Sequence, residues 1–325
     1  MRTALVLGAT GGVGGAVTRA MLARGWHVTA LARDPRRAAV TWGDSVAPEW
    51  QAGDAMNRAD VVRAAEGTSV IVHAVNPPGY RGWDRLVLPM LDNTLAAARD
   101  AGARIVLPGT VYNYDPVLTP VIDETTPQHP RGRKGAIRVE MERRLAEAAP
   151  EVRSLVVRAG DFFGPEAGQS WFAQALAKPP LARIVNPGTP GVGHAWAYLP
   201  DLAEAILCLL ELPSDRLSPF ERLQFPGYDD PDGGGMVAAL RRVSGRPDLP
   251  ERRFPWALMQ ALSPFGGFPR EVLEVRPFWK HPVRLDGRRL TALIGALPRT
   301  ALDEAVAASL RGSSCERRRA LAEDS

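Results

Sequence analysis

The sequence predicts a protein of the α/β class, in which a doubly wound parallel sheet precedes a smaller, mostly helical C-terminal region. Three observations lead to this prediction. Short apolar runs alternate with helical patterns through the first half of the chain, a glycine-rich loop joins the first run to the first helix, and the second half is irregular and rich in proline and glycine. The 325 residues suffice for one large domain or two smaller ones.

Six strands and four helices are predicted in the first half. The strands are expected at residues 3–7, 27–32, 50–52, 70–75, 104–107 and 153–158, and the helices at 16–24, 57–65, 84–100 and 134–148. The side chain of Asn57 can cap the second helix, and Pro89 should kink the third. Because strands alternate with helices, right-handed crossovers should place the strands side by side in one parallel sheet.

The second half is expected to contain short helices separated by loops. Their predicted positions are residues 171–177, 201–211, 236–243, 255–262, 287–294 and 301–310. The apolar pattern fades after Leu310, so residues 313–325 are expected to form a flexible tail.

Charge and composition narrow the classes of function. Lysine and arginine number 40 against 36 aspartate and glutamate residues, and the net charge of +4 is scattered, whereas a nucleic-acid-binding protein would usually concentrate it. Only three of the cations are lysines, namely Lys134, Lys178 and Lys280. A lysine at a chemically meaningful position is therefore informative.

Neither an exported protein nor a membrane protein is expected. Cys208 and Cys315 lie far apart and show no disulfide framework or metal-ligand spacing, which fits a reducing cytoplasm. No apolar run approaches the ~18–20 residues of a membrane span. The N-terminal residues lead directly into the glycine-rich loop and do not form a signal peptide. The prediction is a cytoplasmic protein.

The loop after the first strand reads Gly-Ala-Thr-Gly-Gly-Val-Gly-Gly over residues 8–15. Gly8 permits a tight turn, Gly11 lets the backbone approach a pyrophosphate, and Gly14 lets the helix pack on the strand. The N-terminus of the helix then offers free N–H groups and a positive dipole end to phosphate. No Gly-Lys-Ser/Thr follows, which excludes a Walker-type loop, so the motif predicts dinucleotide binding rather than an ordinary turn.

Five further short segments accompany this loop in order along the chain. They are Gly53-Asp54, residues 73–77, Val111-Tyr112, residues 158–165 and residues 198–203. Together with the glycine-rich loop they resemble the extended and atypical short-chain dehydrogenase/reductases, the superfamily of NAD(P)-dependent epimerases and dehydratases. The resemblance spans about residues 1–310 and implies a Rossmann domain that binds a nicotinamide cofactor.

The loop, the strand ends and this resemblance together imply a set of cofactor contacts. These are Gly8, Thr10, Gly11, Gly12, Val13, Gly14, Arg33, Asp54, Ala55, Ala74, Val75, Asn76, Pro108, Lys134, Ala159 and Asp161. Residues 1–165 should form the Rossmann domain, with 194–228 returning to it, and residues 166–193 and 229–312 should form the substrate-binding region.

The end of the second strand predicts NADP rather than NAD. An NAD site usually carries an acidic residue there, bonded to the ribose 2′-hydroxyl. Here the strand is followed by Arg33, whose guanidinium can pair with a 2′-phosphate, and Asp34 comes one or two positions late for the NAD contact. Arg36 and Arg37 follow, and either assist Arg33 or lie in solvent.

The chain departs from the superfamily where the chemistry takes place. Members commonly use a Ser/Thr after strand five and a Tyr-x-x-x-Lys pair, in which the lysine holds the nicotinamide ribose and lowers the tyrosine pKa. Lys134 matches that lysine, but Pro130 stands four residues before it, and Pro108 stands where the Ser/Thr would fall. Because proline has no proton to donate, the usual proton relay is predicted to be absent.

Three explanations remain open. The proton donor has moved to another side chain, the proton comes from water or substrate, or the protein binds cofactor without turning it over. The candidate donors are Tyr112, Tyr114, His129, His194 and Tyr198. Tyr112 is preferred because it closely follows strand five, at the carboxyl end of the sheet where doubly wound folds bind ligands. The predicted catalytic residues are Tyr112, Lys134 and His194.

A small substrate of apolar or aromatic character is predicted. His194 stands four residues before Tyr198, where nucleotide-sugar enzymes of the superfamily often carry an arginine for the diphosphate, and a neutral histidine would grip a diphosphate poorly. The aromatic residues of the second half are either core or pocket residues. The substrate-binding candidates are Tyr114, Phe163, Trp171, Trp196 and Tyr198.

These features predict an NADP-dependent oxidoreductase that passes a hydride between the nicotinamide and a small organic molecule. The alternatives are a cofactor-retaining epimerase or dehydratase, and a non-catalytic NADP-binding regulatory protein. No metal, nucleic acid or membrane partner is expected, and association as a homodimer stays open.

Overall fold

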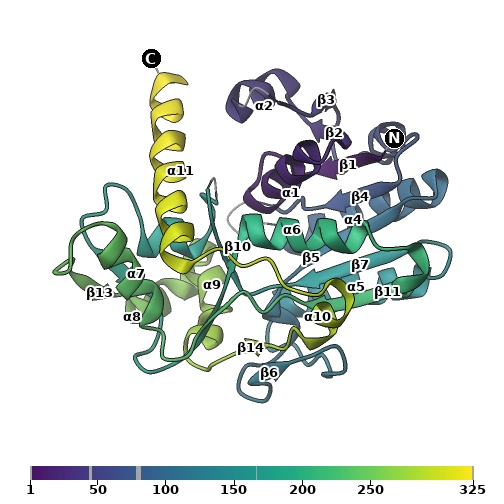
Figure 1. The fold of residues 1–325 in the computed structure, drawn as a ribbon. Coiled ribbons are helices and arrows are strands. Elements are labelled where there is room, and N and C mark those ends of the chain that lie inside the picture. The colour runs from purple at the N-terminus through teal and green to yellow at the C-terminus, as the bar shows by residue number, and fades with distance from the viewer. Residues whose placement is uncertain (1, 44–45, 78–81, 166, 324–325) are drawn as a thin grey trace.

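The computed structural model describes residues 2–43, 46–77, 82–165 and 167–323. Its largest element is a seven-stranded sheet in the order β11-β7-β5-β4-β1-β2-β3, in which every neighbouring pair is parallel. The strands are β1 (Thr3–Leu7), β2 (His27–Ala32), β3 (Glu49–Ala52), β4 (Val70–His73), β5 (Arg104–Gly109), β7 (Ser154–Arg158) and β11 (Phe220–Gln224). The predicted doubly wound parallel sheet is thereby confirmed (Figure 1).

Helices cover both faces of this sheet because its strands are apolar on both sides. In β1, Val6 packs into the core on one face, and its neighbours Leu5 and Leu7 pack into the core on the other. The first face carries α1 (Gly12–Ala23), α6 (Leu199–Leu210) and α10 (Arg288–Ile294), and the second carries α3 (Arg58–Ala64), α4 (Trp83–Ala101) and α5 (Arg133–Ala148).

Most elements predicted for the first half are found within a few residues of their expected bounds. β1 and β2 have the predicted bounds, and Asn57 caps α3 by accepting the N–H of Ala59 at 3.0 Å. α4 continues through Pro89 without interruption. α2 (Pro35–Trp42) and the edge strand β11 were not predicted from the sequence.

The rest of the chain forms a smaller region, helical as predicted but with three small sheets that were not predicted. The sheets are β12-β10-β8, β13-β9 and β14-β6, made of β6 (Val121–Ile122), β8 (Asp161–Phe163), β9 (Ile184–Asn186), β10 (His194–Tyr198), β12 (Tyr228–Asp230), β13 (Glu251–Arg253) and β14 (Arg284–Leu285). The helices are α7 (Gly235–Val243), α8 (Trp256–Leu262), α9 (Gly267–Leu273) and α11 (Leu302–Glu323), and the short helical turns are η2 (Val111–Asn113), η3 (Phe172–Leu176), η4 (Ser214–Arg216), η5 (Ser263–Phe265) and η6 (Arg276–Trp279). α11 (yellow in Figure 1) runs past Leu310, so the end predicted there is wrong.

The chain passes repeatedly between the two parts. β10 pairs with β8 in a small sheet, but α6, which follows directly, packs against α1 beside the large sheet. β11 then extends the large sheet next to β7. These crossings bring residues of the second half to the carboxyl ends of the long parallel strands.

Candidate cofactor and active site

Two close backbone approaches shape the glycine-rich loop. Gly8 has φ +91°, and a Cβ there would lie 2.6 Å from the backbone oxygen of Ala74. A Cβ on Gly14 would lie 2.1 Å from the oxygen of Gly8, so α1 approaches β1 only without a side chain at this position. A Cβ on Gly11 would meet only that oxygen, at 3.3 Å. The fold therefore requires Gly8 and Gly14 but leaves space beside Gly11.

The N-terminus of α1 is suited to an anion. The helix begins at Gly12, no described side chain caps it, and its first turn carries no acidic residue. Thr10 and Gly11 are exposed, and Gly12 and Val13 are half-buried. The first N–H groups of a helix have no partner within the helix, so they remain for a phosphate here.

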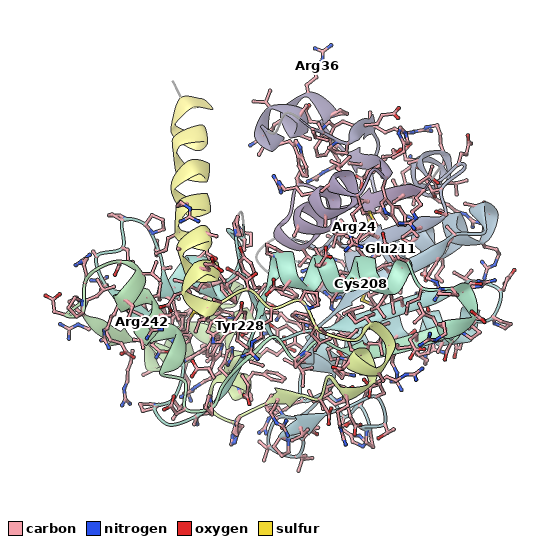
Figure 2. The ribbon with its side chains drawn as sticks, in the orientation of Figure 1. Arg24, Arg36, Cys208, Glu211, Tyr228 and Arg242 are labelled. Atoms are coloured by element: carbon pink, nitrogen blue, oxygen red, sulfur yellow. The ribbon has the colours of Figure 1, made fainter. Side chains whose placement is uncertain are left out.

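Two charged residues, Arg33 and Asp34, follow β2 and have different surroundings. Asp34 caps α2, because its Oδ1 accepts the N–H of Arg37 at 3.0 Å. Arg33 is exposed and forms no hydrogen bond or ion pair with any residue that the structure describes. Figure 2 shows Arg36 on the outer side of α2, pointing away from the rest of the chain. Arg33 is thus the cation of this loop that lies next to the strand end.

The other predicted cofactor residues lie along the same edge of the sheet. Asp54 and Ala55 follow β3, Ala74, Val75 and Asn76 follow β4, Pro108 lies in β5, and Ala159 and Asp161 follow β7. The loop after β3 is fixed by Asn93 of α4, whose Nδ2 donates to the oxygen of Ala55 at 2.9 Å. Pro108 and Ala159 are buried, whereas Asn76 is exposed at the mouth of this edge.

His73, the last residue of β4, is buried behind this edge. Its Nδ1 lies 2.8 Å from the hydroxyl of Thr94, which itself donates to the oxygen of Met90 at 3.0 Å. Its Nε2 has no hydrogen-bond partner among the described residues. Burial lowers the pKa of His73 to about 3, and the charge of Arg138 acts in the same direction. The imidazole therefore stays neutral in the folded protein.

This neutral histidine predicts a specific sensitivity to acid. Below the ordinary pKa of about 6.5 the unfolded chain binds a proton that the folded chain excludes, so stability falls as the pH drops from about 6.5 toward 3. His73→Leu should remove up to about 1.4 kcal/mol of this loss per pH unit. Urea unfolding of both proteins at several pH values measures it, and parallel profiles would contradict the prediction.

Lys134 is held by the C-terminal region. Its side chain is 1% exposed, and Nζ donates to Oε2 of Glu271 and Oε2 of Glu274, both at 2.5 Å, and to the backbone oxygen of Glu271 at 3.2 Å. An ammonium has three N–H donors, so all three have acceptors here. Burial alone would raise the pKa of Glu271, but the bond and charge of Lys134, with Arg133, lower it below its ordinary value. The ribose hydroxyls predicted as partners of Lys134 would have to replace these carboxylates.

Tyr112 lies beside the first turn of α5. A Cβ on Gly135 would be 2.0 Å from the backbone oxygen of Tyr112 and 2.7 Å from Cβ of Pro130, so η2, Pro130 and the helix meet closely. The half-buried ring of Tyr112 lies 5.3 Å from that of Phe278. Thr110, at the end of β5, carries a hydroxyl whose oxygen accepts the N–H of Tyr112 at 3.4 Å. Thr110 lies two residues after Pro108, so a hydroxyl does follow β5, and the sequence shows it at this position.

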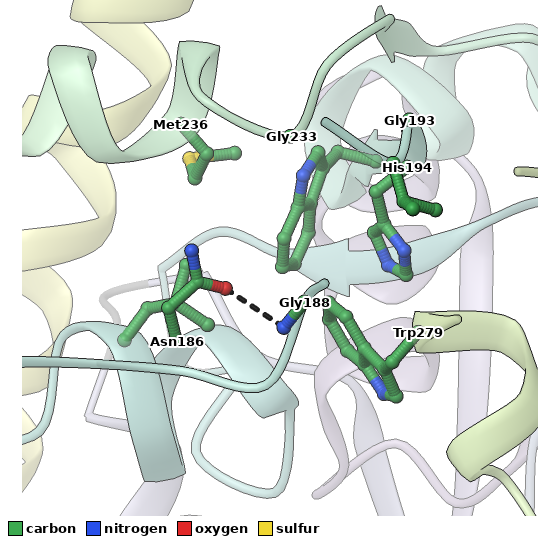
Figure 3. A pocket seen from close by; sticks show the side chains of 10 residues that line it. Asn186, Gly188, Gly193, His194, Gly233, Met236 and Trp279 are labelled. Atoms are coloured by element: carbon green, nitrogen blue, oxygen red, sulfur yellow. Dashed lines mark hydrogen bonds between the residues drawn. The ribbon is translucent and has the colours of Figure 1, made fainter. Parts of the chain in front are cut away.

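His194 is joined to Asp161, a pairing that the sequence analysis did not predict. Nε2 of His194 lies 2.8 Å from Oδ2 of Asp161, and its ring stacks on Trp279 with centroids 3.8 Å apart and planes 8° apart (Figure 3). The cavity beside this pair measures about 10 Å³, roughly the space of one water molecule. Because Phe278 contacts Tyr112 and Trp279 contacts His194, the single turn η6 links two of the three predicted catalytic side chains.

A buried polar network lies under the loop after β5, and the sequence analysis missed it. Arg158, fully buried at the end of β7, pairs with Glu142 of α5 and donates Nε to the oxygen of Thr110 at 2.8 Å. Glu142 also accepts from Asn113 at 2.9 Å. The guanidinium of Arg158 lies 5.1 Å from the ring of Tyr114, which is 1% exposed. This network fixes the loop that carries Tyr112.

The substrate-binding candidates are mostly buried. Tyr114, Phe163, Trp196 and Tyr198 are at most 6% exposed, and Trp171 is half-buried between other aromatic rings. Trp196 is also part of the lining of a larger cavity of about 460 Å³. Other lining residues include Tyr228, Asp229, Met236, Arg299 and Leu302. This volume is typical of small-molecule pockets.

The described part of the chain contains neither a candidate metal site nor a helix that could span a membrane. No group of three or more His, Cys, Asp or Glu side chains there is arranged to hold a metal ion. None of its helices combines the length and the apolar composition needed to cross a bilayer.

Solved structures share this fold over the whole chain. UDP-glucuronic acid 4-epimerase from Bacillus cereus in complex with NAD superposes with a TM-score of 0.74, at 15% identity, over 98% of both chains. MoeE5 in complex with UDP-glucuronic acid and NAD superposes with a TM-score of 0.73, at 17% identity, over 96% of this chain and 99% of the other. At such identities the likeness shows the fold alone.

Sequence comparisons match the N-terminal part of the chain to a family model and the chain to two curated proteins. Residues 8–137 match the family model described as NAD(P)H-binding. The chain is 31% identical over 180 residues to 3-diazoavenalumate denitrifying reductase of a Streptomyces species, over 50% of this chain and 57% of that protein. It is 27% identical over 223 residues to epimerase family protein SDR39U1 of Bos taurus, over 64% of this chain and 69% of that protein. These matches give the chain an NAD(P)H-binding segment and sequence similarity to a reductase and to an epimerase family protein.

The match to the NAD(P)H-binding model agrees with the resemblance inferred from the ordered motifs. The glycine-rich loop, the ends of β2 to β4 and Lys134 all lie within residues 8–137, the segment that matches the NAD(P)H-binding model. The match to the reductase spans little more than half of that protein's length.

Proposed function

We propose that this protein is an NADP-dependent oxidoreductase of the short-chain dehydrogenase/reductase type, acting on a small, apolar or aromatic organic molecule. The observation that carries the choice of cofactor is at the end of β2, where Arg33 has no ion-pair partner among the described residues and Asp34 is engaged as the cap of α2. A free guanidinium suits a 2′-phosphate, with which it forms charge-assisted bonds. The similarity to a reductase supports reduction as the type of reaction.

Arg33→Ala is expected to weaken NADPH binding about ten- to hundredfold and to leave NADH binding nearly unchanged. A charge-assisted hydrogen bond is worth roughly 1.5–3 kcal/mol, and NADH lacks the phosphate that would form it. Fluorescence titration with both cofactors measures the effect. Arg36→Ala is the matched control, because Arg36 points away from the chain and should leave both affinities near wild type (Figure 2). Equal losses for both cofactors in Arg33→Ala would contradict the assignment.

The proposed substrate is a small molecule because the space near His194 is filled. His194 is paired with Asp161 and stacked on Trp279, and the adjoining cavity has room for about one water molecule. A sugar diphosphate would require these rings to separate. The larger cavity beside Trp196 has the volume and part of the aromatic lining that an apolar or aromatic molecule needs.

In this proposal a bound nicotinamide cofactor would supply a hydride to the substrate carbon, and the chain would supply the proton. We assign the proton to the hydroxyl of Tyr112, which would donate it to the substrate oxygen and be reprotonated from water. Two contacts support the assignment: Tyr112 lies against the first turn of α5, and its loop is fixed by the network around Arg158. His194, whose Nε2 lies 2.8 Å from Oδ2 of Asp161, is the alternative donor.

A cofactor-binding protein without turnover is the second candidate. It is favoured by Lys134, whose three donors are taken by two carboxylates and a backbone oxygen, and by Pro130 in place of a tyrosine. Absorbance of NADPH in the presence of carbonyl, imine and activated-alkene compounds separates the candidates. Steady oxidation supports the oxidoreductase, and tight binding without oxidation supports the regulatory protein. Isomerised product with no net oxidation would instead indicate a cofactor-retaining epimerase.

A further inference from the structure

The contact between α9 and the start of α5 is built from charged groups. Besides the three bonds to Nζ of Lys134, Oε1 of Glu274 accepts the backbone N–H of Lys134 at 3.0 Å, and Oε1 of Glu271 accepts from Arg133 at 2.9 Å. A Cβ on Gly132 would lie 2.6 Å from Cγ of Glu274. Two glutamates thus cover the beginning of α5 closely.

The segment that carries these glutamates has few other anchors to the large sheet. α9 packs mainly against its chain neighbours α8, η5 and η6. Val272 is buried, but Phe265 is 87% exposed and Phe268 is 52% exposed. The outer side of the segment buries little apolar area. Its position therefore depends on the bonds to Lys134 and Arg133.

The same segment has the backbone of a hinge at one end. Gly266, between η5 and α9, and Gly267, the first residue of α9, have φ of +76° and +65°, and a Cβ on Gly266 would meet nothing within 4 Å. Glycine adopts such angles without strain and also leaves them easily. At the other end, Phe278 and Trp279 are buried and hold η6 in place. α9 can therefore swing about the two glycines while η6 stays packed.

We propose that residues 263–274 form an autoinhibitory latch, which competes with the nicotinamide cofactor for Lys134. This inference rests on the proposed function, in which the lysine binds the cofactor ribose. The ammonium cannot serve three acceptors from the latch and the ribose hydroxyls at once, so cofactor binding requires the latch to leave. The apparent dissociation constant is then the intrinsic one divided by the fraction of molecules with the latch open.

Hydrogen exchange of the unmodified protein tests the latch directly. If the latch opens, the backbone amides of residues 263–274 should exchange faster when saturating NADPH is added. Slower exchange would mean that the segment closes over the cofactor, and unchanged exchange with NADPH bound would mean that it does not respond. Either result overturns the latch.

A charge-neutral variant tests the competition. In Glu271→Gln/Glu274→Gln the latch loses both carboxylates, so NADPH should bind at least about tenfold more tightly, and exchange of residues 263–274 should be fast already without cofactor. Glu147→Gln, which removes an exposed ion pair from the far end of α5, is the matched control and should behave as wild type. Lys134→Ala in the same assay should weaken binding.

The outcomes separate the latch from the proposed function. If wild type binds NADPH and the double variant binds it no more tightly, the latch is wrong and the oxidoreductase stands. If neither protein binds NADPH or NADH, the proposed function is wrong and the latch falls with it. If only the double variant binds, both are supported. Should the double variant fail to fold, the exchange measurement on wild type still decides.

Discussion

Tyr112→Phe is expected to lower turnover about 10²–10⁴-fold while leaving NADPH binding intact. General acid catalysis by a positioned side chain contributes an effect of this size, and the substitution removes only the hydroxyl. The variant keeps the ring, its contact with Phe278 and the close approach of the Tyr112 backbone oxygen to Gly135. Initial rates with a compound found active in the absorbance screen, together with NADPH titration, measure the two quantities separately.

His194→Gln tests the alternative proton donor in the same reaction. Glutamine can still hydrogen-bond to Asp161 but cannot exchange a proton at neutral pH. If Tyr112 is the donor, His194→Gln should affect turnover far less than Tyr112→Phe. Full activity in Tyr112→Phe with a large loss in His194→Gln would move the donor to the imidazole.

Gly11→Val should abolish cofactor binding, with a loss of more than about a hundredfold, and leave the free energy of unfolding nearly unchanged. The backbone at Gly11 is extended, with φ −94° and ψ 166°, a conformation that valine favours, and a Cβ there meets only the oxygen of Gly8 at 3.3 Å. The side chain would instead occupy the space that the pyrophosphate needs. Calorimetric NADPH titration and urea unfolding measure the two effects.

Gly14→Ala is the contrasting substitution in the same loop. Its Cβ would lie 2.1 Å from the oxygen of Gly8, so α1 and β1 must move apart, at a cost of at least about 1–3 kcal/mol. Here stability and binding should fall together. Normal NADPH binding by a well-folded Gly11→Val protein would place the cofactor elsewhere on the molecule.

The parts of the fold that sequence reasoning predicts are those set by local pattern. β1 and β2 are apolar runs with clear ends, and Gly8 and Gly14 indicate the turn between β1 and α1. Asn57 marks the start of α3 in the same local way. β11 was missed because Phe220–Gln224 has only two apolar residues, separated by a glutamate and an arginine, and so lacks the apolar run of a buried strand.

The parts of the site that escaped prediction depend on contacts between distant residues. Lys134 is correctly identified as unusual, but its partners Glu271 and Glu274 come 137 and 140 residues later, with no local signal. The pairing of His194 with Asp161 likewise depends on how β8 and β10 align. Arg33 and Asp34 form the intermediate case: both are visible in the sequence, but only the capping bond shows that Asp34 has a structural task.

The burial of Lys134 affects how this side chain reacts with acylating reagents. Apart from the N-terminal amine, the chain offers an acylating reagent only three amines, and two of them, on Lys178 and Lys280, are exposed. The third is shielded at 1% exposure for as long as α9 stays in place. Acylation of Lys134, located by peptide mass and scaled to that of Lys178 and Lys280, would therefore count the molecules in which α9 has moved away.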